Sequence, residues 1–407
     1  MKNILIAIRS IFKKGRHNVM KIVSLGIGLA VGLVLIAKVY FEQSYDDFYP
    51  DRDRVYQVWA KYQQNGGELK DYPQTSGGIA PTMQQQIPEI ETVTRYTSFG
   101  DWTFTMTDTK MKYSGRCIIA DSCFFDILPR PMLIGNAKEV LSTPMYVLIS
   151  SRIAKNIGGD VIGKNFTVDN SPGRTMTIGG VFEEVPENSH SRYDVIVSMA
   201  SAGRFMWEGS PTNMLGNDRY ISYVKLHKGV NPLALEEQVR TFVNSYFPPE
   251  EQQKVGLSID FSFHKLDNLH KELPQVKRMT WILSLLAFAL IFTAVMNYIL
   301  IVISSIVNRS KEVAVHKCYG ASENNIHGMM FGEALVHIVL SLILALLLIL
   351  AFRGTVEELL ATSLDSLLLS NGSLVLLGIC ILVFFVSGFM PGSLYCLLYT
   401  STSPRDK

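Results

Sequence analysis

The chain has 407 residues, of which 48% are hydrophobic and only 18% are charged. Soluble domains carry about 25% charged residues, so this composition excludes an ordinary soluble protein, and we expect no nucleic-acid partner. The first 40 residues contain seven Lys/Arg and no acid, whereas residues 41–279 contain 25 Lys/Arg and 29 Asp/Glu, a net charge of −4. A basic start, a mixed middle and an apolar end predict a membrane protein with one folded extracytoplasmic domain.

Residues 1–21 are predicted to form a basic amphipathic helix on the cytoplasmic surface of the membrane. Its apolar positions recur at helical spacing: Ile4, Leu5, Ile8, Ile11 and Phe12. Its basic positions lie opposite them: Arg9, Lys13, Lys14 and Arg16. The alternative for this segment is a short solvated basic tail.

The first membrane span is predicted at residues 22–41, of which residues 22–37 carry no charge. We expect Lys38 to snorkel to the far interface. An uncleaved anchor is favoured over a signal peptide, because the apolar run is long and no small-residue cleavage site follows it. Gly28 and Gly32 form a small-xxx-small pair that would let another helix approach closely.

Three further spans are predicted within residues 279–308, at 329–352 and at 373–390, since about 20 apolar residues cross a bilayer. Basic residues mark the cytoplasmic side of a membrane protein. They precede span one and also lie between spans two and three. The loop after span three instead has one base and three acids: Arg353, Glu357, Glu358 and Asp365. Both termini are therefore placed in the cytoplasm, and residues 42–278 outside it.

Residues 42–278 are predicted to form an α+β domain with two subdomains, one inserted in the other. Alternating, strand-like segments recur along it: residues 54–59, 103–106, 117–120, 145–149, 166–168, 175–182, 194–197 and 220–226. Helical segments separate them: residues 79–86, 151–156 and 233–246. Strands mixed with helices, without a regular βαβ alternation, indicate the α+β class.

No motif in this domain indicates an enzyme. Residues 158–164 satisfy the first seven positions of a phosphate-binding loop, but Asn165 replaces the Ser/Thr that would bind magnesium, and a strand follows. His264 and His270 lack the Cys or acid cluster that would complete a zinc site. His190 follows three acids and is expected to lie in an exposed acidic loop. We expect no catalytic residue, no metal and no cofactor.

The five cysteines do not form a disulfide framework. Cys117 and Cys123 both lie in the extracytoplasmic domain, where a bridge between them is chemically permitted. Nothing in a spacing of six residues requires that bridge. Two free buried thiols are the simpler expectation, and the bridge stays open as the alternative.

Several segments before span two resemble the MacB-type periplasmic core domain. They are FEQSYDDF at residues 41–48, RVYQV at 54–58, FFDI at 124–127, IGK at 162–164 and GVFEEVPENSH at 180–190. After span two, RSKEVAVHKCYGAS at residues 309–322 and FGEA at 331–334 resemble the FtsX-type permease signature. Together these segments cover nearly the whole chain in the expected order, and they are most similar to permeases of Bacteroidetes-like bacteria.

The resemblance implies an inner-membrane permease subunit of an ABC transporter, with a periplasmic domain and with transmembrane helices in an FtsX-like domain at residues 279–395. It implies that a separate cytoplasmic ATPase moves the periplasmic domain without carrying substrate through the bilayer. Such mechanotransmission would serve export or envelope remodelling. Other implied partners are a second permease copy or a fused second half, a periplasmic adaptor and the lipid bilayer.

The resemblance also implies which residues couple the chain to the ATPase. The coupling element is the basic loop between spans two and three: Arg309, Lys311, Glu312, Val315, Lys317, Gly320 and Ala321. Gly320 and Ala321 would end its helix. A basic loop also suits an acidic partner surface on electrostatic grounds alone. Two polar residues lie inside span three: Glu333 is expected to form a structural ion pair, and His337 to be hydrogen-bonded between helices.

Two other classes of function were weighed against this one. A membrane receptor or regulator would sense a ligand or control a cell-wall hydrolase through the large domain, but its cytoplasmic segments are too short for a signalling domain. A membrane-anchored enzyme would need a catalytic constellation. Residues 396–407 resemble translated adapter DNA, so we expect a non-native tail and a natural chain that continues beyond residue 395, as the first half of a longer tandem permease would.

Overall fold

The computed structural model of the protein describes residues 18–169, 171–318 and 323–368, with scattered helical positions between 372 and 386. Two predicted features therefore lie outside the described residues. They are most of the amphipathic helix at residues 1–21 and the tail at 396–407.

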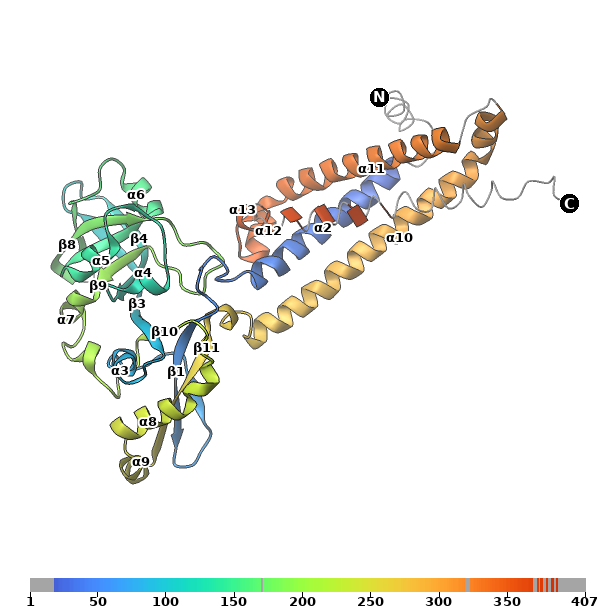
Figure 1. The fold of residues 1–407 in the computed structure, drawn as a ribbon. Helices are drawn as coiled ribbons and strands as arrows, with labels where there is room; N and C mark the ends of the chain where they lie inside the picture. The colour runs from blue at the N-terminus through green and yellow to red at the C-terminus, as the bar shows by residue number, and fades with distance from the viewer. Residues whose placement is uncertain are drawn as a thin grey trace. The chain divides into compact units, whose positions relative to one another are not determined.

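The chain divides into two compact units. The membrane unit comprises Met1–Ser44 and Leu273–Lys407, and the ectodomain comprises Tyr45–Glu272. The chain leaves the membrane unit once and returns to it once, so the ectodomain is an insertion after the first described helix (Figure 1).

The described part of the membrane unit has three long helices and two short ones. The long helices are α2 (Asn18–Gln43), α10 (Pro274–Cys318) and α11 (Glu323–Ala351). The short ones are α12 (Arg353–Leu360) and α13 (Leu364–Leu368). α2 lies between α10 and α11 and contacts both along its length (Figure 1). Half of the apolar stretch of α2 is buried inside the unit, against 11% for α10, so α2 is the central helix.

Glycines on α2 permit this close packing. A Cβ atom at Gly28 would lie 2.4 Å from the Cβ of Ala294 on α10, and one at Gly32 would lie 2.7 Å from Ile291. A Cβ atom at Gly26 would lie 2.9 Å from the side chain of Leu344 on α11. At Gly28 the neighbouring atom is a Cβ that cannot rotate away, so only glycine fits there, whereas at Gly26 and Gly32 the neighbouring side chains would have to shift. The predicted small-residue contact face is confirmed.

Two described helices are long and apolar enough to cross a membrane, Ile22–Gln43 and Pro274–Leu300. A third crossing is present if the pair Leu335–Ala351 and Arg353–Leu360, bent by 69°, counts as one span. The fourth predicted span, at residues 373–390, lies largely outside the described residues. The count of four spans therefore stays a prediction.

The ectodomain is built around one mixed sheet of eleven strands. The strands are β1 (Val55–Gln64), β2 (Lys70–Tyr72), β3 (Ile90–Met106), β4 (Lys112–Ala120), β5 (Met132–Ile134), β6 (Tyr146–Ser150), β7 (Asn165–Val168), β8 (Ser171–Phe182), β9 (Val195–Ser198), β10 (Ile221–Leu226) and β11 (Leu257–Lys265). Their main order is β11-β1-β10-β3-β4-β9-β6-β8-β5, with β2 beside β1, and β7 beside β3 and β8. Among the described pairings, only β4–β9 and β6–β8 are parallel.

Short helices connect these strands. They are α3 (Ile79–Gln86), α4 (Phe124–Ile127), α5 (Ala137–Ser142), α6 (Ser151–Ile157), α7 (Ala202–Phe205), α8 (Glu236–Tyr246) and α9 (Pro249–Val255). Local sequence explains several of their ends. The side chains of Asn136 and Ser150 accept from backbone N–H groups at the starts of α5 and α6. Gly256, in the left-handed conformation, ends α9.

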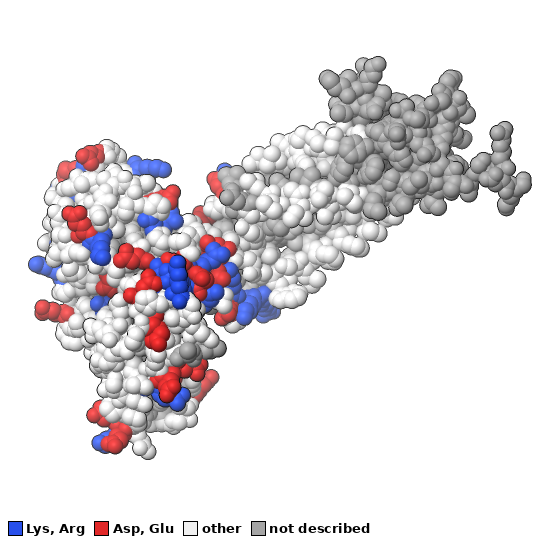
Figure 2. Space-filling model, in the orientation of Figure 1, with Lys and Arg blue, Asp and Glu red and all other residues white. Residues whose placement is uncertain are grey.

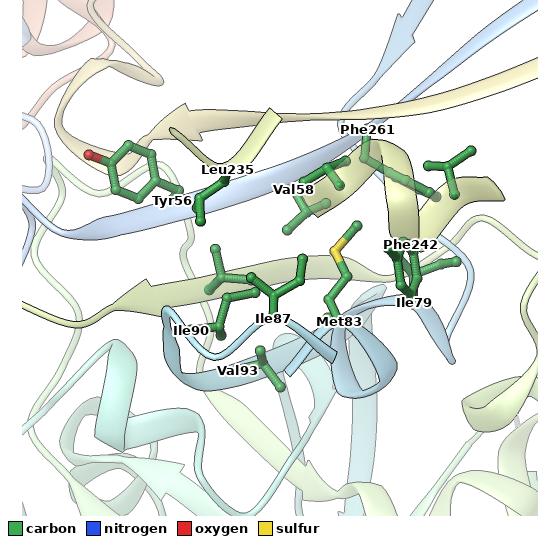
Figure 3. Close-up of a cluster of buried hydrophobic side chains, with 14 of the residues drawn as sticks. Tyr56, Val58, Ile79, Met83, Ile87, Ile90, Val93, Leu235, Phe242 and Phe261 are labelled. Carbon is green, nitrogen blue, oxygen red and sulfur yellow. The ribbon is translucent and has the colours of Figure 1, made fainter. Parts of the chain in front are cut away.

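The hydrophobic core of the ectodomain is divided into three clusters along the sheet. In the first cluster, α3 and α8 pack on β1, β10 and β11 (Figure 3). Met83 and Val58 are fully buried there, and Phe242 is 1% exposed. Burying such side chains stabilises the fold by about 1.5–3 kcal/mol each. The separate clusters suit two subdomains, but the sheet is continuous, so that division stays a prediction.

The prediction of strands mixed with helices is confirmed at every predicted segment, and the helix at residues 79–86 has the predicted bounds. Six elements were not predicted from the sequence pattern: β2, β5, β11, α4, α5 and α9. β11 carried a signal, because the sequence LSIDFSFHK alternates along its nine residues. The other missed elements have three to seven residues, too few for a period to emerge.

Candidate functional site

The predicted coupling residues lie at the end of one uninterrupted helix. α10 has 45 residues, which corresponds to a length of about 67 Å at 1.5 Å per residue. A bilayer core is about 30 Å thick, so this helix extends well beyond it. The backbone of Arg309, Lys311, Glu312, Val315 and Lys317 belongs to its last ten residues; their side chains lie outside the described part.

The remaining predicted residues are distributed around the next helix. Gly320 and Ala321 lie outside the described residues, between the end of α10 and the start of α11. Glu333 is on α11, with its side chain outside the described part. His337, one turn further along α11, is 2% exposed inside the membrane unit. The structure thus describes the burial of one predicted intramembrane residue and leaves the ion pair of the other untested.

Hydrogen bonds link α2 to both neighbouring helices. Asn297 Nδ2 on α10 donates to Ser24 Oγ on α2, at 2.5 Å. Ser341 Oγ on α11 donates to the backbone oxygen of Ile22, at 3.2 Å. Polar side chains of this kind hold helices together inside a bilayer. Their register cannot be read from single apolar runs, so the sequence did not predict these contacts.

Lys38 near the C-terminal end of α2 is buried, which corrects the expectation that it would snorkel. It is 6% exposed and its Nζ lies 2.6 Å from Glu42, one turn further along. Its Nζ also donates to Oγ1 of Thr362, between α12 and α13, at 2.8 Å. These two partners offset part of the cost of removing the ammonium group from water. The contact fastens the α12–α13 segment to α2.

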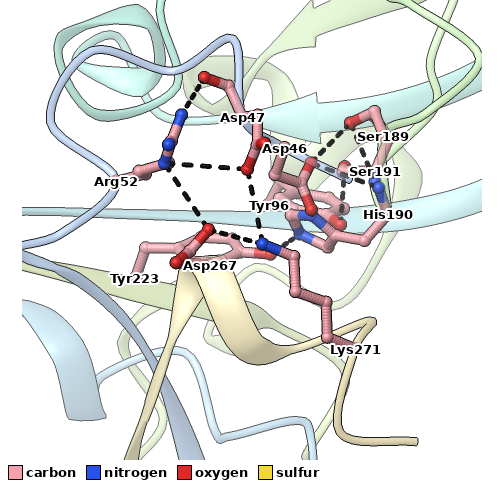
Figure 4. A network of polar contacts seen from close by, with 10 residues as sticks. All are labelled: Asp46, Asp47, Arg52, Tyr96, Ser189, His190, Ser191, Tyr223, Asp267 and Lys271. Atoms are coloured by element: carbon pink, nitrogen blue, oxygen red, sulfur yellow. Dashed lines mark hydrogen bonds and ion pairs between the residues drawn. The ribbon is translucent and has the colours of Figure 1, made fainter. Parts of the chain in front are cut away.

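Ten polar residues of the ectodomain form a network that we call the linker clamp (Figure 4). They are Asp46, Asp47, Arg52, Tyr96, Ser189, His190, Ser191, Tyr223, Asp267 and Lys271. The clamp joins two linkers: the N-terminal linker, residues 45–52, follows α2, and the C-terminal linker, residues 267–271, precedes α10.

Asp46 is the buried centre of the clamp, with 1% exposure. Its carboxylate accepts from Ser189 Oγ at 3.1 Å and from the backbone N–H of His190 at 3.3 Å. Nδ1 of His190 lies 2.7 Å from the second carboxylate oxygen. The backbone N–H of Asp46 donates to Asn188 at 2.9 Å. Because a carboxylate only accepts, Nδ1 of His190 is the donor, and its Nε2 faces Tyr223.

The tyrosines extend this network to the middle of the sheet. Tyr223 on β10 is hydrogen-bonded to Nε2 of His190, and Tyr96 on β3 accepts from Ser191 Oγ at 2.8 Å. Burial raises the pKa of Tyr96 to about 12. Burial, with Tyr96 and Asp46 adding to it, also raises the pKa of Tyr223. Both hydroxyl groups therefore stay protonated at neutral pH, and that of Tyr223 is the donor to Nε2 of His190.

The second half of the clamp is ionic. Lys271 Nζ lies 3.0 Å from Asp267 and 3.4 Å from Asp47, and Arg52 lies 3.5 Å from Asp267. The guanidinium of Arg52 also donates to the backbone oxygen of Asp47. Partial burial disfavours the charge on Asp267, but Lys271 and Arg52 outweigh it and lower the pKa of that carboxyl. The two linkers are thus held together by alternating charges.

The environment of His190 contradicts the expectation of an exposed acidic loop. Its side chain is 16% exposed and is bonded on both ring nitrogens. The signal was present in the sequence, because the segments 41–48 and 180–190 both carry the family resemblance. The structure brings them into contact across 144 residues.

The ectodomain contains two further features that the sequence singled out, a pair of cysteines and a segment that resembles a phosphate-binding loop. Cys117 is buried and Cys123 partly buried, and both are free thiols, so the simpler prediction for them is confirmed. The segment that resembles a phosphate-binding loop, residues 158–164, connects α6 to β7, so a strand follows it as predicted. Among the described residues, no group of three or more His, Cys, Asp or Glu side chains is placed to hold a metal ion.

Surface charge differs between the two units. On the face shown in Figure 2, charged side chains are spread over the ectodomain, whereas the described surface of the membrane unit is almost free of them. Large apolar side chains on α10 are exposed there, among them Leu285 and Phe288 at 67% each. Trp281, near the start of α10, is 78% exposed. An apolar band with an aromatic residue near its edge is typical of a surface in contact with lipid.

Each half of the chain matches a known protein family. The family described as MacB-like periplasmic core domain matches residues 20–242, and the family described as FtsX-like permease C-terminal matches residues 284–404. A comparison with curated proteins gave no match.

Three solved structures are each similar to about half of the chain. A domain of a protein named as a permease from Porphyromonas gingivalis is 33% identical, with a TM-score of 0.49, covering 53% of this chain and 91% of that one. The periplasmic region of MacB from Actinobacillus actinomycetemcomitans is 14% identical, with a TM-score of 0.37, covering 54% and 92%. The extracellular domain of the ABC-type transporter YknZ from Gram-positive bacteria is 11% identical, with a TM-score of 0.36, covering 50% and 98%.

Proposed function

The chain belongs to the family of MacB/FtsX-type permeases and is an ABC transporter permease subunit, and we propose that a separate cytoplasmic ATPase drives movement of its periplasmic domain. Permeases of this family are inner-membrane proteins that work with a cytoplasmic ABC ATPase. The orientation that the basic residues favour puts both termini and the loop between α10 and α11 on the ATPase side.

The continuity of α10 carries this proposal. One helix leads from Pro274, three residues after the C-terminal linker, to the predicted coupling residues, without a described break. Each turn of a helix is fixed by hydrogen bonds to the next turn, so a push at one end displaces the other. α2, packed on α10 through Gly28 and Gly32, provides a second connection that moves with it.

The ATPase would bind at the end of α10. Arg309, Lys311 and Lys317 give that end a positive charge, which attracts an acidic surface. Glu312 and Val315 would complete the contact, and Gly320 with Ala321 would form the turn. Glu333 would pair with Lys311 or Lys317, close to the same interface. The movement would serve export or envelope remodelling, with a second permease copy or fused half completing the transporter, and with a periplasmic adaptor as a further partner.

Co-purification tests this proposal. The tagged chain is isolated in mild detergent from its native host, associated proteins are identified, and ATP hydrolysis is measured. We expect a stoichiometric ABC ATPase that is lost when Lys311 and Lys317 are both changed to Glu. The matched control Lys254→Glu, on exposed α9, should retain it. Intact chain without an ATPase, across several detergents and after crosslinking, would contradict the proposal and favour a receptor.

A further inference from the structure

We propose that three consecutive residues, Tyr45, Asp46 and Asp47, are the joint through which movement of the membrane helices enters the ectodomain. This inference rests on the proposed function and deepens it, because it names the residues that transmit the movement. The three residues directly follow the end of α2 and its terminal turn, and each contacts a different part of the ectodomain.

Tyr45 fastens the N-terminal linker to the C-terminal linker. Its ring stacks on His270, with ring centroids 3.4 Å apart and planes inclined by 7°. His270 lies four residues before the first residue of α10, Pro274. The first residue after the membrane unit is therefore in contact with the last residues before the chain returns to it. Movement of either linker carries the other.

Asp47 reinforces that link with charge. Its carboxylate faces Lys271 at 3.4 Å and Arg52 at 3.7 Å, and both cations also face Asp267. Two cations between two carboxylates resist separation of the linkers in either direction. The side chains of these residues are only partly buried, so this half of the joint is solvated and would yield before the buried half.

Asp46 connects the linkers to the sheet. It holds the loop between β8 and β9 through Ser189 and His190, and His190 reaches Tyr223 on β10. β10 and β3 are neighbours at the middle of the sheet order, and Tyr96 on β3 binds the same loop through Ser191. A displacement of Asp46 therefore acts on central strands.

The backbone at Asp46 is consistent with a fixed joint. Its φ of 61° is in the left-handed region, which residues with a side chain adopt rarely, although Asp and Asn tolerate it best. The surrounding hydrogen bonds hold that conformation. A linker that served only as a flexible tether would have no need of a buried, strained and fully bonded residue directly after a membrane helix.

The test measures nucleotide-driven movement in the full chain, together with its co-purified ATPase in lipid nanodiscs. Spin labels at Lys254→Cys on α9 and Glu358→Cys on α12 report the distance between the two units, with and without magnesium ATP and vanadate. The joint variants are Asp46→Asn, which suits the left-handed backbone, His190→Gln and Tyr223→Phe. The control variant is Asp218→Asn, whose side chain bonds Tyr62 and Ser76 elsewhere in the ectodomain.

We expect the joint variants to keep the ATPase and a folded ectodomain, while the population that shifts on ATP falls about three- to tenfold. The control should shift as the parent does. Folded joint variants that shift as fully as the parent would overturn the inference. So would failure of all three joint variants to fold, since the clamp would then be a structural staple. A parent chain that binds no ATPase would instead defeat the proposed function.

Discussion

At the scale of single residues, burial decides which polar side chains matter. Three acids shortly precede His190 in the sequence, and two of them, Glu183 and Glu184, are exposed. His190 instead has a hydrogen-bond partner on each ring nitrogen. Its Nδ1 donates to one oxygen of the buried Asp46 carboxylate, whose other oxygen accepts from Ser189 and from a backbone N–H. Removing a hydrogen-bond donor from a buried carboxylate leaves one of its oxygens unsatisfied, which costs more than losing an exposed contact.

We therefore expect His190→Ala to lower the free energy of unfolding of the ectodomain by about 3 kcal/mol. His227 is exposed, so His227→Ala should change it by less than about 0.5 kcal/mol. Urea unfolding followed by tryptophan fluorescence measures both, because Trp59, Trp102 and Trp207 all lie in the ectodomain. Equal effects of the two substitutions would contradict the assignment of His190 to the clamp.

The free cysteines give a second residue-scale prediction. Burial raises the pKa of the Cys117 thiol well above its ordinary value, and burial with nearby Asp121 raises that of Cys123. The reactive thiolate is therefore scarce at pH 8. Both cysteines should label with a maleimide only after unfolding, as mass spectrometry of ectodomain peptides would show. Finding a peptide pair linked by a Cys117–Cys123 disulfide would refute this prediction.

At the scale of helices, the glycines of α2 determine how closely the neighbouring helices pack against it. Gly28→Val would place atoms where Ala294 lies, and such overpacking destabilises by about 1–3 kcal/mol. Gly354 on α12 has open space around it, so Gly354→Ala should be neutral or stabilising by up to about 1 kcal/mol. The melting temperature of the detergent-solubilised chain compares them. An unchanged value for Gly28→Val would mean that α10 does not pack at this glycine.

The ion pair near the C-terminal end of α2 gives a prediction that separates the effect of charge from that of packing. Lys38→Met removes the cation that faces the buried carboxylate of Glu42 and should destabilise by about 3–5 kcal/mol. The double variant with Glu42→Leu removes both charges and should recover most of that loss. The melting temperatures of the single and the double variant measure the two effects. A double variant as unstable as Lys38→Met would show that packing, and not charge, was lost.

At the scale of the whole molecule, the chain is a membrane unit interrupted by one folded insertion, and the two linkers are the connections between them. The apolar length of local stretches indicated an insertion between membrane helices, and the two compact units agree with it, whereas the orientation that the basic residues favour stays a prediction. The strands and helices with a clear period, such as β8 and α3, were also predicted from local stretches.

The linker clamp could not be predicted in this way. Asp46 and His190 are separated by 144 residues, and neither carries a local pattern that specifies its partner. Lys38 was expected at the interface because a lone lysine in an apolar segment has no visible partner in sequence. Its second partner, Thr362, is 324 residues away. Long-range pairing depends on the fold, which single-sequence periodicity does not contain.

Site-directed photocrosslinking tests the central claim most directly. A photoreactive residue is introduced at Lys311 or, as the control, at Glu358, and membranes of the native host are irradiated. We expect a covalent adduct with an ABC ATPase at position 311 and none at position 358, because the placement of basic residues predicts that these positions lie on opposite sides of the membrane. Absence of the adduct at 311, or its presence at 358, would contradict both the orientation and the coupling role of α10.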